Sequence, residues 1–379
     1  MKRITILIVI LASVCVFITI KTQYTNAGQR AAESTRGLTA KQQLGKKLFF
    51  DKNLSTPTGQ ACADCHSPDA GFANLDSSLP VSRGVYPDRF GFRNDLTAAY
   101  ASFSPEFHYD SATESYIGGS FWDGRAKNIL EQAKGPFLNN LEMANPDAAA
   151  VVNKVRNSDY SGSFREVFSA DALQDVNRAY NLIAEAIADY EKSSELNQFS
   201  SKFDLYLKGK IKLTDKELRG LALFENKDKG NCATCHISKP GKDGTPPVFS
   251  DFGYDNLGIP KNAENPYYYL PKTLNPDGLK AVDLGLGAVV KDAAQNGKFR
   301  TPTLRNVAKT APYAHNGYFK TIRQIVSFYN TRDIGPWPVP EVSANINKAD
   351  LGNLKLTEEE IDDIVAFLET LTDGFQPPK

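Results

Sequence analysis

Two Cys-x-x-Cys-His pentads are the clearest chemical feature of this chain. They run from Cys62 to His66 and from Cys232 to His236. In this pattern the two cysteines attach to the vinyl groups of one haem, and the histidine becomes an axial ligand of the iron. A zinc site or a redox dithiol is the alternative for one pentad, but two pentads favour haem. We therefore predict two covalently bound c-type haems. The attachment sites are Cys62, Cys65, Cys232 and Cys235, and the iron ligands are His66 and His236.

Length and charge narrow the function classes. The chain has 379 residues, with 44 Lys plus Arg and 44 Asp plus Glu, so its formal net charge is zero. A balanced chain lacks the basic excess of nucleic-acid-binding proteins, and we expect no nucleic-acid partner. The length is sufficient for two hydrophobic cores of ordinary size.

The first residues have the pattern of an export signal. Lys2 and Arg3 precede an apolar run over 4–20, and polar sequence follows. We predict that 1–27 is a signal peptide or an N-terminal anchor, which would tether the protein to a membrane. Export agrees with c-type haem, because bacteria attach this cofactor outside the cytoplasm. The predicted location is therefore the periplasm.

An internal repeat indicates two domains. The segment 38–49 recurs as 213–224, and each copy begins with a threonine and a glutamine or glutamate three residues later. This capping-box pattern predicts an amphipathic helix that leads to each pentad. Helical patterns over 177–191 and 356–371 close the two halves, and the second of them begins with another capping box.

A helix, a haem pentad and a closing helix make up a c-type cytochrome unit. We therefore predict a mainly α fold of two tandem cytochrome c-like domains, each with one covalently attached haem and long loops. The predicted domains are 28–200 and 201–379. Between each pentad and the closing helix lies a long stretch rich in Gly, Pro, Asn and Asp, and we expect no strand-rich region.

A second repeat distinguishes the two haems. The segment 121–125 resembles 314–318 at an offset of 193 residues, and this frame pairs Pro136 with Tyr329. A phenolate oxygen binds ferric iron, whereas proline has no donor atom. The hypothesis is that Tyr329 is the sixth ligand of the second haem, and that the first haem is open above Pro136. The alternative is that Tyr329 packs in a core.

These motifs resemble the bacterial dihaem cytochrome c peroxidase family over nearly all of the chain after the leader. The segments that carry the resemblance are the two pentads, 121–125, 131–136, 141–143, 299–306, 310–313 and 315–317. The resemblance implies two cytochrome c domains with a calcium ion between them. Asn94, Thr310 and Pro312 match the calcium ligands of the family, the last two through their backbone carbonyls.

The resemblance also implies a peroxide site at the N-terminal haem. Glu142 matches the acid–base catalyst, and Gln132 matches an amide that orients peroxide. Trp122 matches an indole between the two haems, and Pro136 leaves the iron open. A plain dihaem electron carrier would need no such pocket, which argues against that function.

Tyrosine in place of the usual methionine at position 329 resembles the MauG-like branch of this family. Its type member oxidises tryptophans in a precursor of methylamine dehydrogenase. The first hypothesis is therefore an oxidase that uses hydrogen peroxide at the open haem, shares the oxidising equivalents with the Tyr329-ligated haem and oxidises a protein partner. The alternative is a peroxidase that reduces hydrogen peroxide with electrons from a small redox protein, a cytochrome c or a cupredoxin.

At Gly230 the chain departs from the family pattern, and the resemblance assigns no role to Trp337 or His108. The type member has a surface tryptophan two residues before the second pentad, where this chain has Gly230, so we expect a different electron exit. Trp337 follows Tyr329 in a Pro-rich stretch, and we interpret it as a packing residue. His108 is interpreted as a loop histidine and is given no ligand role.

Overall fold

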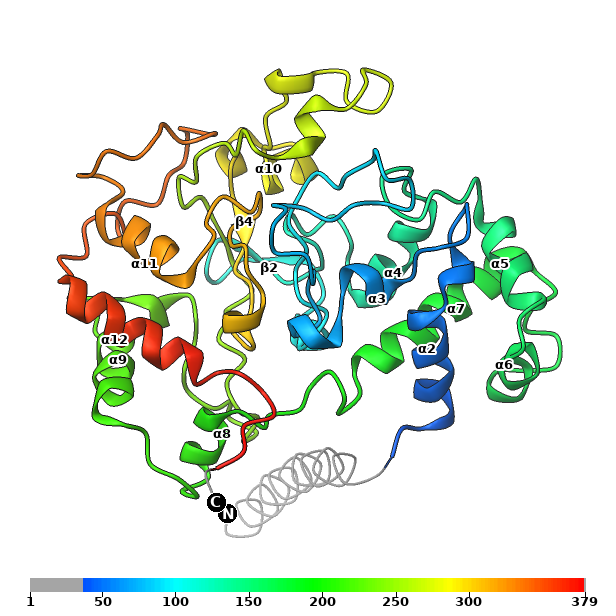
Figure 1. Cartoon of the computed structure of the whole chain (residues 1–379), viewed down its shortest axis with the longest axis horizontal. Helices are drawn as coiled ribbons and strands as arrows, with labels where there is room; N and C mark the ends of the chain where they lie inside the picture. Colours follow the sequence, from blue (N-terminus) through cyan, green and yellow to red (C-terminus); the bar gives the residue numbers. More distant parts are fainter. Residues whose placement is uncertain (1–36, 378–379) are drawn as a thin grey trace, which may run out of the picture.

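The computed structural model describes residues 37–377, so the predicted leader at 1–27 lies outside the described part. Most of the helices form two groups, one from each half of the chain, at the two sides of the molecule in Figure 1. The first group contains α2 (Ala40–Phe50), α3 (Cys62–Cys65), α4 (Ile129–Leu138), α5 (Ala148–Arg156), α6 (Ser161–Val167) and α7 (Val176–Glu191). The second half contains α8 (Lys202–Leu207), α9 (Asp215–Glu225), α10 (Leu286–Val290), α11 (Ile322–Thr331) and α12 (Glu358–Glu369).

The strands are short and lie between the two groups. β1 (His108–Asp110) pairs antiparallel with β2 (Ser115–Ile117), and β3 (Tyr254–Asp255) pairs antiparallel with β4 (Phe299–Arg300). The described residues therefore contain no strand-rich region, as the sequence predicts. The long stretches that follow the pentads consist mostly of loops and short 3₁₀ turns. Within the described range, no helix is both long and apolar enough to cross a membrane.

The predicted helix starts are confirmed. Thr39, Thr214 and Thr357 are the N-caps of α2, α9 and α12, and each helix has a complete capping box with the residue three positions later. These interactions satisfy backbone N–H groups that have no partner within the helix. Local sequence alone therefore determines where these three helices begin.

Two glycines allow the helix before each pentad to cross closely over the last helix of its half. Helix α2 packs on α7, and α9 packs on α12. A Cβ atom at Gly45 would lie 1.9 Å from the carbonyl oxygen of Ala186, and one at Gly220 would lie 1.9 Å from that of Asp363. Since backbone atoms cannot yield as a flexible side chain does, only glycine fits at either crossing.

We expect Gly45→Ala to destabilise the protein by about 1–3 kcal/mol or more, because the methyl group forces α2 away from α7. Denaturant unfolding followed by circular dichroism measures this loss. Gly162→Ala on α6 is the matched control, since a Cβ there has no atom within 4 Å. The close crossing is not required for stability if the two variants unfold at the same denaturant concentration.

Each half has a hydrophobic cluster of its own. One cluster contains residues of α2, α4, α5 and α7, and the other contains residues of α8, α9, α11 and α12. The halves are joined by polar contacts. The Tyr100 hydroxyl donates to Asp373 at 2.8 Å, and Arg93 forms ion pairs with both Asp123 and Asp283 at 2.6 Å. These contacts hold the two pentad regions in one orientation.

Helices α4 and α11 are equivalent in the two halves. Their bounds differ by the same 193 residues that relate the sequence segments, since Ile129 corresponds to Ile322 and Leu138 to Thr331. Pro136 and Tyr329 therefore occupy the same position along equivalent helices. The repeat frame is confirmed at the level of secondary structure.

Candidate active site

The pentads adopt short helical turns that gather their reactive side chains. Cys62 to Cys65 form α3, while Cys232 to Thr234 form a 3₁₀ turn, and in each the histidine N–H donates to the carbonyl of the first cysteine at 2.9 Å. The four cysteines are free thiols in the structure. Neither pentad is therefore closed into a disulfide.

Both pentad histidines are held by a backbone carbonyl. His66 Nδ1 donates to the Phe72 oxygen at 3.1 Å, and His236 Nδ1 donates to the Phe249 oxygen at 2.8 Å. This bond places the proton on Nδ1 and leaves Nε2 with its lone pair, which is the arrangement of a metal-bound histidine. Burial lowers the pKa of both rings, so the neutral form that binds iron is favoured.

Each pentad opens onto a cavity. We call the space around the first pentad the first cavity and that around the second pentad the second cavity; they enclose about 1720 Å³ and 1650 Å³, open mouths included. The predicted residues that line the first cavity are Cys62, Cys65, His66, Asn94, Trp122, Gln132, Pro136 and Glu142. Those that line the second are Cys232, Cys235, His236, Trp122, Asn94, Thr310, Pro312 and Tyr329. The structure thus brings all the predicted site residues to these two cavities.

The residues fit two covalently attached haems. Each cavity has two unpaired thiols on one wall and a histidine nitrogen free to bind iron. Among the described residues no group of three or more His, Cys, Asp or Glu side chains is placed to hold a metal ion, which argues against the alternative of a zinc site. His66 and His236 would hold the irons from the side of the cysteines.

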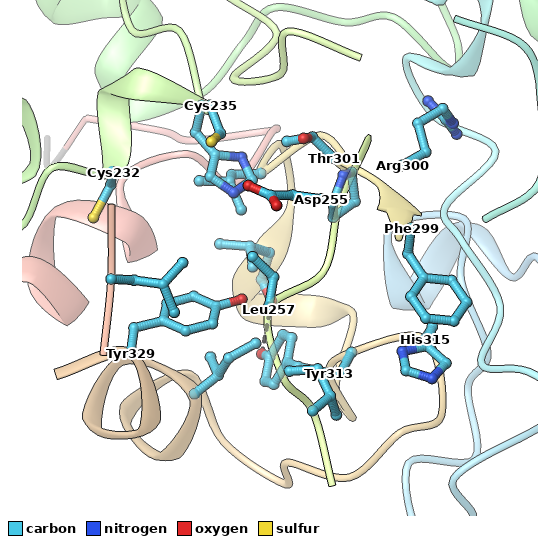
Figure 2. Close-up of a pocket in the computed structure, with 18 of the residues that line it drawn as sticks. Cys232, Cys235, Asp255, Leu257, Phe299, Arg300, Thr301, Tyr313, His315 and Tyr329 are labelled. Atoms are coloured by element: carbon cyan, nitrogen blue, oxygen red, sulfur yellow. Dashed lines mark hydrogen bonds between the residues drawn. The ribbon is translucent and has the colours of Figure 1, made fainter. Parts of the chain in front are cut away.

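The far side of each cavity differs at one position. Figure 2 shows Tyr329 of α11 with its hydroxyl directed into the second cavity, across from Cys232 and Cys235. At the equivalent position of α4, Pro136 lines the first cavity with a ring that has no donor atom. The second cavity therefore has a phenol oxygen across from its two cysteines, and the first has none at the equivalent position.

Glu142 and Gln132 lie in the first cavity with Pro136. Asn139 Nδ2 donates to Glu142 Oε1 at 2.6 Å, which orients the carboxyl group and leaves Oε2 free to carry a proton. Burial raises the pKa of Glu142, and the carboxylate of Asp95 adds to the effect, while the bond from Asn139 opposes it. A carboxyl group with a raised pKa is suited to acid–base work near neutral pH.

Trp122 forms a wall that both cavities share. Its indole is 9% exposed, and Nε1 donates to the carbonyl of Asn94 at 2.8 Å. The backbone oxygen of Trp122 also accepts from the N–H of Arg300 at 2.7 Å, which ties the residue to the other half of the chain. An aromatic system therefore stands between the two cavities.

Two charged residues near this wall could not be identified from spacing. Asp95 and Arg300 both line the two cavities. Burial raises the pKa of Asp95 to about 6 and lowers the pKa of Arg300. A guanidinium in this place would suit the carboxylate edge of a haem. The sequence places both residues next to predicted ones, since Asp95 follows Asn94 and Arg300 lies in the 299–306 segment, but it does not indicate that they line the cavities.

The three predicted calcium ligands, Asn94, Thr310 and Pro312, come from both halves of the chain and line the second cavity. The Asn94 side chain donates to the Pro80 carbonyl at 3.1 Å, and its oxygen is the atom that would face a cation. The calcium ion itself stays a prediction.

Of the other residues singled out from the sequence, His108 lies outside both cavities and Gly230 lines the second cavity. His108 is exposed on β1 and pairs with Ile117, so it lies on a strand and not in a loop as predicted, and its Nδ1 donates to the Glu106 carbonyl at 2.8 Å. A Cβ at Gly230 would lie 2.5 Å from the Leu223 carbonyl oxygen. The turn that follows α9 therefore has no room for a tryptophan at position 230.

Comparisons with known proteins agree on one family. The profile of the Di-haem cytochrome c peroxidase family matches residues 39–212. Over 354 residues the chain is 39% identical to methylamine utilization protein MauG from Paracoccus denitrificans (strain Pd 1222), which covers 88% of this chain and 89% of that protein. It is 32% identical over 353 residues to cytochrome c551 peroxidase from Pseudomonas aeruginosa, covering 92% and 82%.

Solved structures give the same result. The diheme peroxidase BthA from Burkholderia thailandensis E264 superimposes with a TM-score of 0.78 at 35% identity, covering 89% of this chain and 87% of that one. A MauG-like protein associated with microbial copper homeostasis superimposes with a TM-score of 0.67 at 27% identity, covering 89% and 91%. With its two pentads, two cavities and shared indole wall, the chain belongs to the di-haem cytochrome c peroxidase family and is a haem peroxidase-family enzyme.

Proposed function

We propose that this protein is a MauG-like oxidase, which uses hydrogen peroxide to oxidise a protein partner. Family membership already implies two c-type haems, hydrogen peroxide and a redox protein partner. The observation that carries the finer assignment is the pair of equivalent positions on α4 and α11. Pro136 lies over the first cavity, and Tyr329 directs a hydroxyl into the second. We further propose that the protein acts in the periplasm, where such haems are attached.

The reaction consumes two electrons and two protons for each hydrogen peroxide and yields two water molecules. When bound in the first cavity, the haem supplies the iron that takes up peroxide and accepts its oxidising power. Glu142 takes a proton from one peroxide oxygen at Oε2 and delivers it to the other, while Asn139 holds Oε1. Gln132 orients the peroxide, and Pro136 keeps the space above the iron free of a protein ligand.

Trp122 links the two sites in this proposal. Its buried indole borders both cavities, so an electron from the second site reaches the first through an aromatic ring instead of solvent. A phenolate from Tyr329 is a hard anionic ligand and favours oxidised iron, whereas a thioether favours the reduced state. Tyr329 therefore suits an enzyme that stores oxidising equivalents at both sites.

The test is the electron paramagnetic resonance and optical spectrum of the haem-loaded protein and of Tyr329→Phe. We expect one high-spin and one low-spin ferric haem in the wild type, and loss of the low-spin signal in the variant, because the phenyl ring has no donor atom. Tyr318→Phe is the matched control, since this tyrosine belongs to the same aromatic cluster but does not line the second cavity.

Two results would refute the proposal. One is a wild-type protein with two low-spin haems, and the other is an unchanged low-spin signal in Tyr329→Phe. Tyr329→Met separates the two candidate functions. If the variant oxidises reduced cytochrome c faster than the wild type does and no longer stores oxidising equivalents, Tyr329 is what distinguishes this protein from an ordinary cytochrome-c peroxidase.

A further inference from the structure

Trp337 lies behind Tyr329 in a small aromatic cluster. Its ring centroid is 5.1 Å from that of Phe328 and 6.1 Å from that of Phe319. Phe328 in turn lies 6.0 Å from the ring of Tyr329. A continuous series of ring contacts therefore connects the second cavity with Trp337. Trp337 packs against other rings, as interpreted from the sequence. Packing alone does not explain why an indole stands at the end of this series of rings.

The surface around Trp337 is apolar. Ile334 is 65% exposed and Val339 is 83% exposed, the most exposed of the large hydrophobic side chains in the described part of the chain. Pro336 and Pro338 are exposed as well. We call these four residues the relay patch. The two charged side chains next to it in the sequence, Arg332 and Asp333, pair with each other at 2.9 Å.

The indole is fixed in place beneath this surface. Trp337 is half-buried, and its Nε1 donates to Thr331 Oγ1 at 2.9 Å, which in turn donates to the Ser327 carbonyl at 2.8 Å. An indole gives up an electron more readily than the phenyl rings around it. Trp122, the other tryptophan of the chain, is buried between the cavities, and Gly230 has no room for a side chain.

We propose that Trp337 relays electrons between the Tyr329 site and a protein that docks on the relay patch. The proposal rests on the proposed function, because it requires oxidising equivalents at the second site. Trp337 gives one electron inward and regains one from the docked protein, and two such transfers match the two electrons that hydrogen peroxide takes up. The indole proton stays on Nε1, where Thr331 holds it.

The chemistry of the relay patch indicates what kind of protein docks there. The four exposed side chains of the patch are all apolar, and the neighbouring Arg332 and Asp333 neutralise each other. Such a surface fits a partner whose oxidisable group lies within an uncharged, apolar surface. The occupant is therefore the electron-donating protein partner.

The first experiment follows oxidation within the protein, independently of turnover. The haem-loaded full chain is treated with hydrogen peroxide without any electron donor, and its peptides are analysed by mass spectrometry. We expect oxygen adducts on Trp337 in excess of those on Tyr269 and Tyr109, although these tyrosines are 64% and 52% exposed. Adducts in order of exposure would show attack by diffusing oxidants and would overturn the relay.

The second experiment measures electron transfer with reduced cytochrome c as the probe protein. Trp337→Phe keeps the ring packing but removes the indole, and we expect its rate of cytochrome c oxidation to fall about tenfold or more. Trp337→Tyr, which restores an oxidisable ring, should recover most of the loss. Val339→Glu should raise KM for cytochrome c with little change in kcat, because it places a charge in the patch.

Failure of the relay and failure of the proposed function are distinguishable. If Trp337→Phe oxidises cytochrome c at the wild-type rate while Tyr329→Phe loses its low-spin signal, the relay is wrong and the proposed function stands. If Tyr329→Phe keeps that signal, the proposed function falls, whatever Trp337 does. The initial absorbance change with peroxide alone should be the same in wild type and Trp337→Phe, which confirms that the first cavity is intact.

Discussion

Glu142→Gln is expected to lower the rate of peroxide consumption about 10²- to 10⁴-fold, the range for loss of a positioned acid–base catalyst. The amide keeps the shape of the side chain and its place in the first cavity, but it takes no proton from peroxide. The rate of the first absorbance change after mixing with hydrogen peroxide measures the effect directly. Glu131→Gln is the control, since Glu131 lies nearby on α4 but pairs with Lys134 near the surface.

The pH dependence gives a second signature of the same group. Glu142 must be ionised to accept a proton from peroxide, and burial raises its pKa above that of an ordinary glutamate. The rate should therefore fall on the acid side at a higher pH than a solvent-exposed glutamate would produce. Glu142→Gln should lack this acid limb. A variant with the wild-type limb would assign the proton transfer to another group, with Asp95 of the same cavity as the first candidate.

Arg305→Met is expected to destabilise the fold by about 3–5 kcal/mol, because it leaves the charge of Asp204 buried without a partner. Both side chains are fully buried, and two guanidinium nitrogens bind the two carboxylate oxygens at 2.6 and 2.9 Å. The same guanidinium donates to the Pro247 carbonyl at 2.7 and 2.8 Å. Arg305→Lys should recover little, since an ammonium group lacks the two-pronged geometry.

Denaturant unfolding followed by circular dichroism checks this prediction, and Asp171→Asn is the control. Asp171 pairs with Arg178 at the surface, and its loss should leave the unfolding midpoint almost unchanged. A loss below about 1 kcal/mol for Arg305→Met would show that Asp204 becomes neutral or hydrated at little cost.

The buried pair also predicts a pH effect. Burial would raise the pKa of Asp204, but the hydrogen bonds and charge of Arg305 outweigh it, so the pKa lies below its usual value. The stabilisation is therefore present above the pKa of aspartate in the unfolded chain. It is lost as the pH falls through the lowered pKa of the folded state.

Features that depend on short spacing were predictable from the sequence. The pentads need only five adjacent residues, and the capping boxes at Thr39, Thr214 and Thr357 need four. The internal repeat predicted more than spacing, because it paired Pro136 with Tyr329, and α4 and α11 have matching bounds in that frame. Family resemblance added Glu142, Gln132 and Trp122, whose roles no local pattern indicates.

The sequence by itself determined the identity of the cofactor and the helix starts, because bonding over a few residues sets both. The internal repeat also identified the position where the two halves differ, because equivalent helices keep the same order along the chain. Only the tertiary structure decided what stands between and around the cavities. Trp122 became a shared wall because Arg300, far along the chain, binds its backbone. Asp95 and Arg300 joined the site, and Trp337 came to lie behind Tyr329, through contacts between distant segments. Such contacts depend on how side chains pack in three dimensions, and the spacing of residues along the chain does not predict this packing.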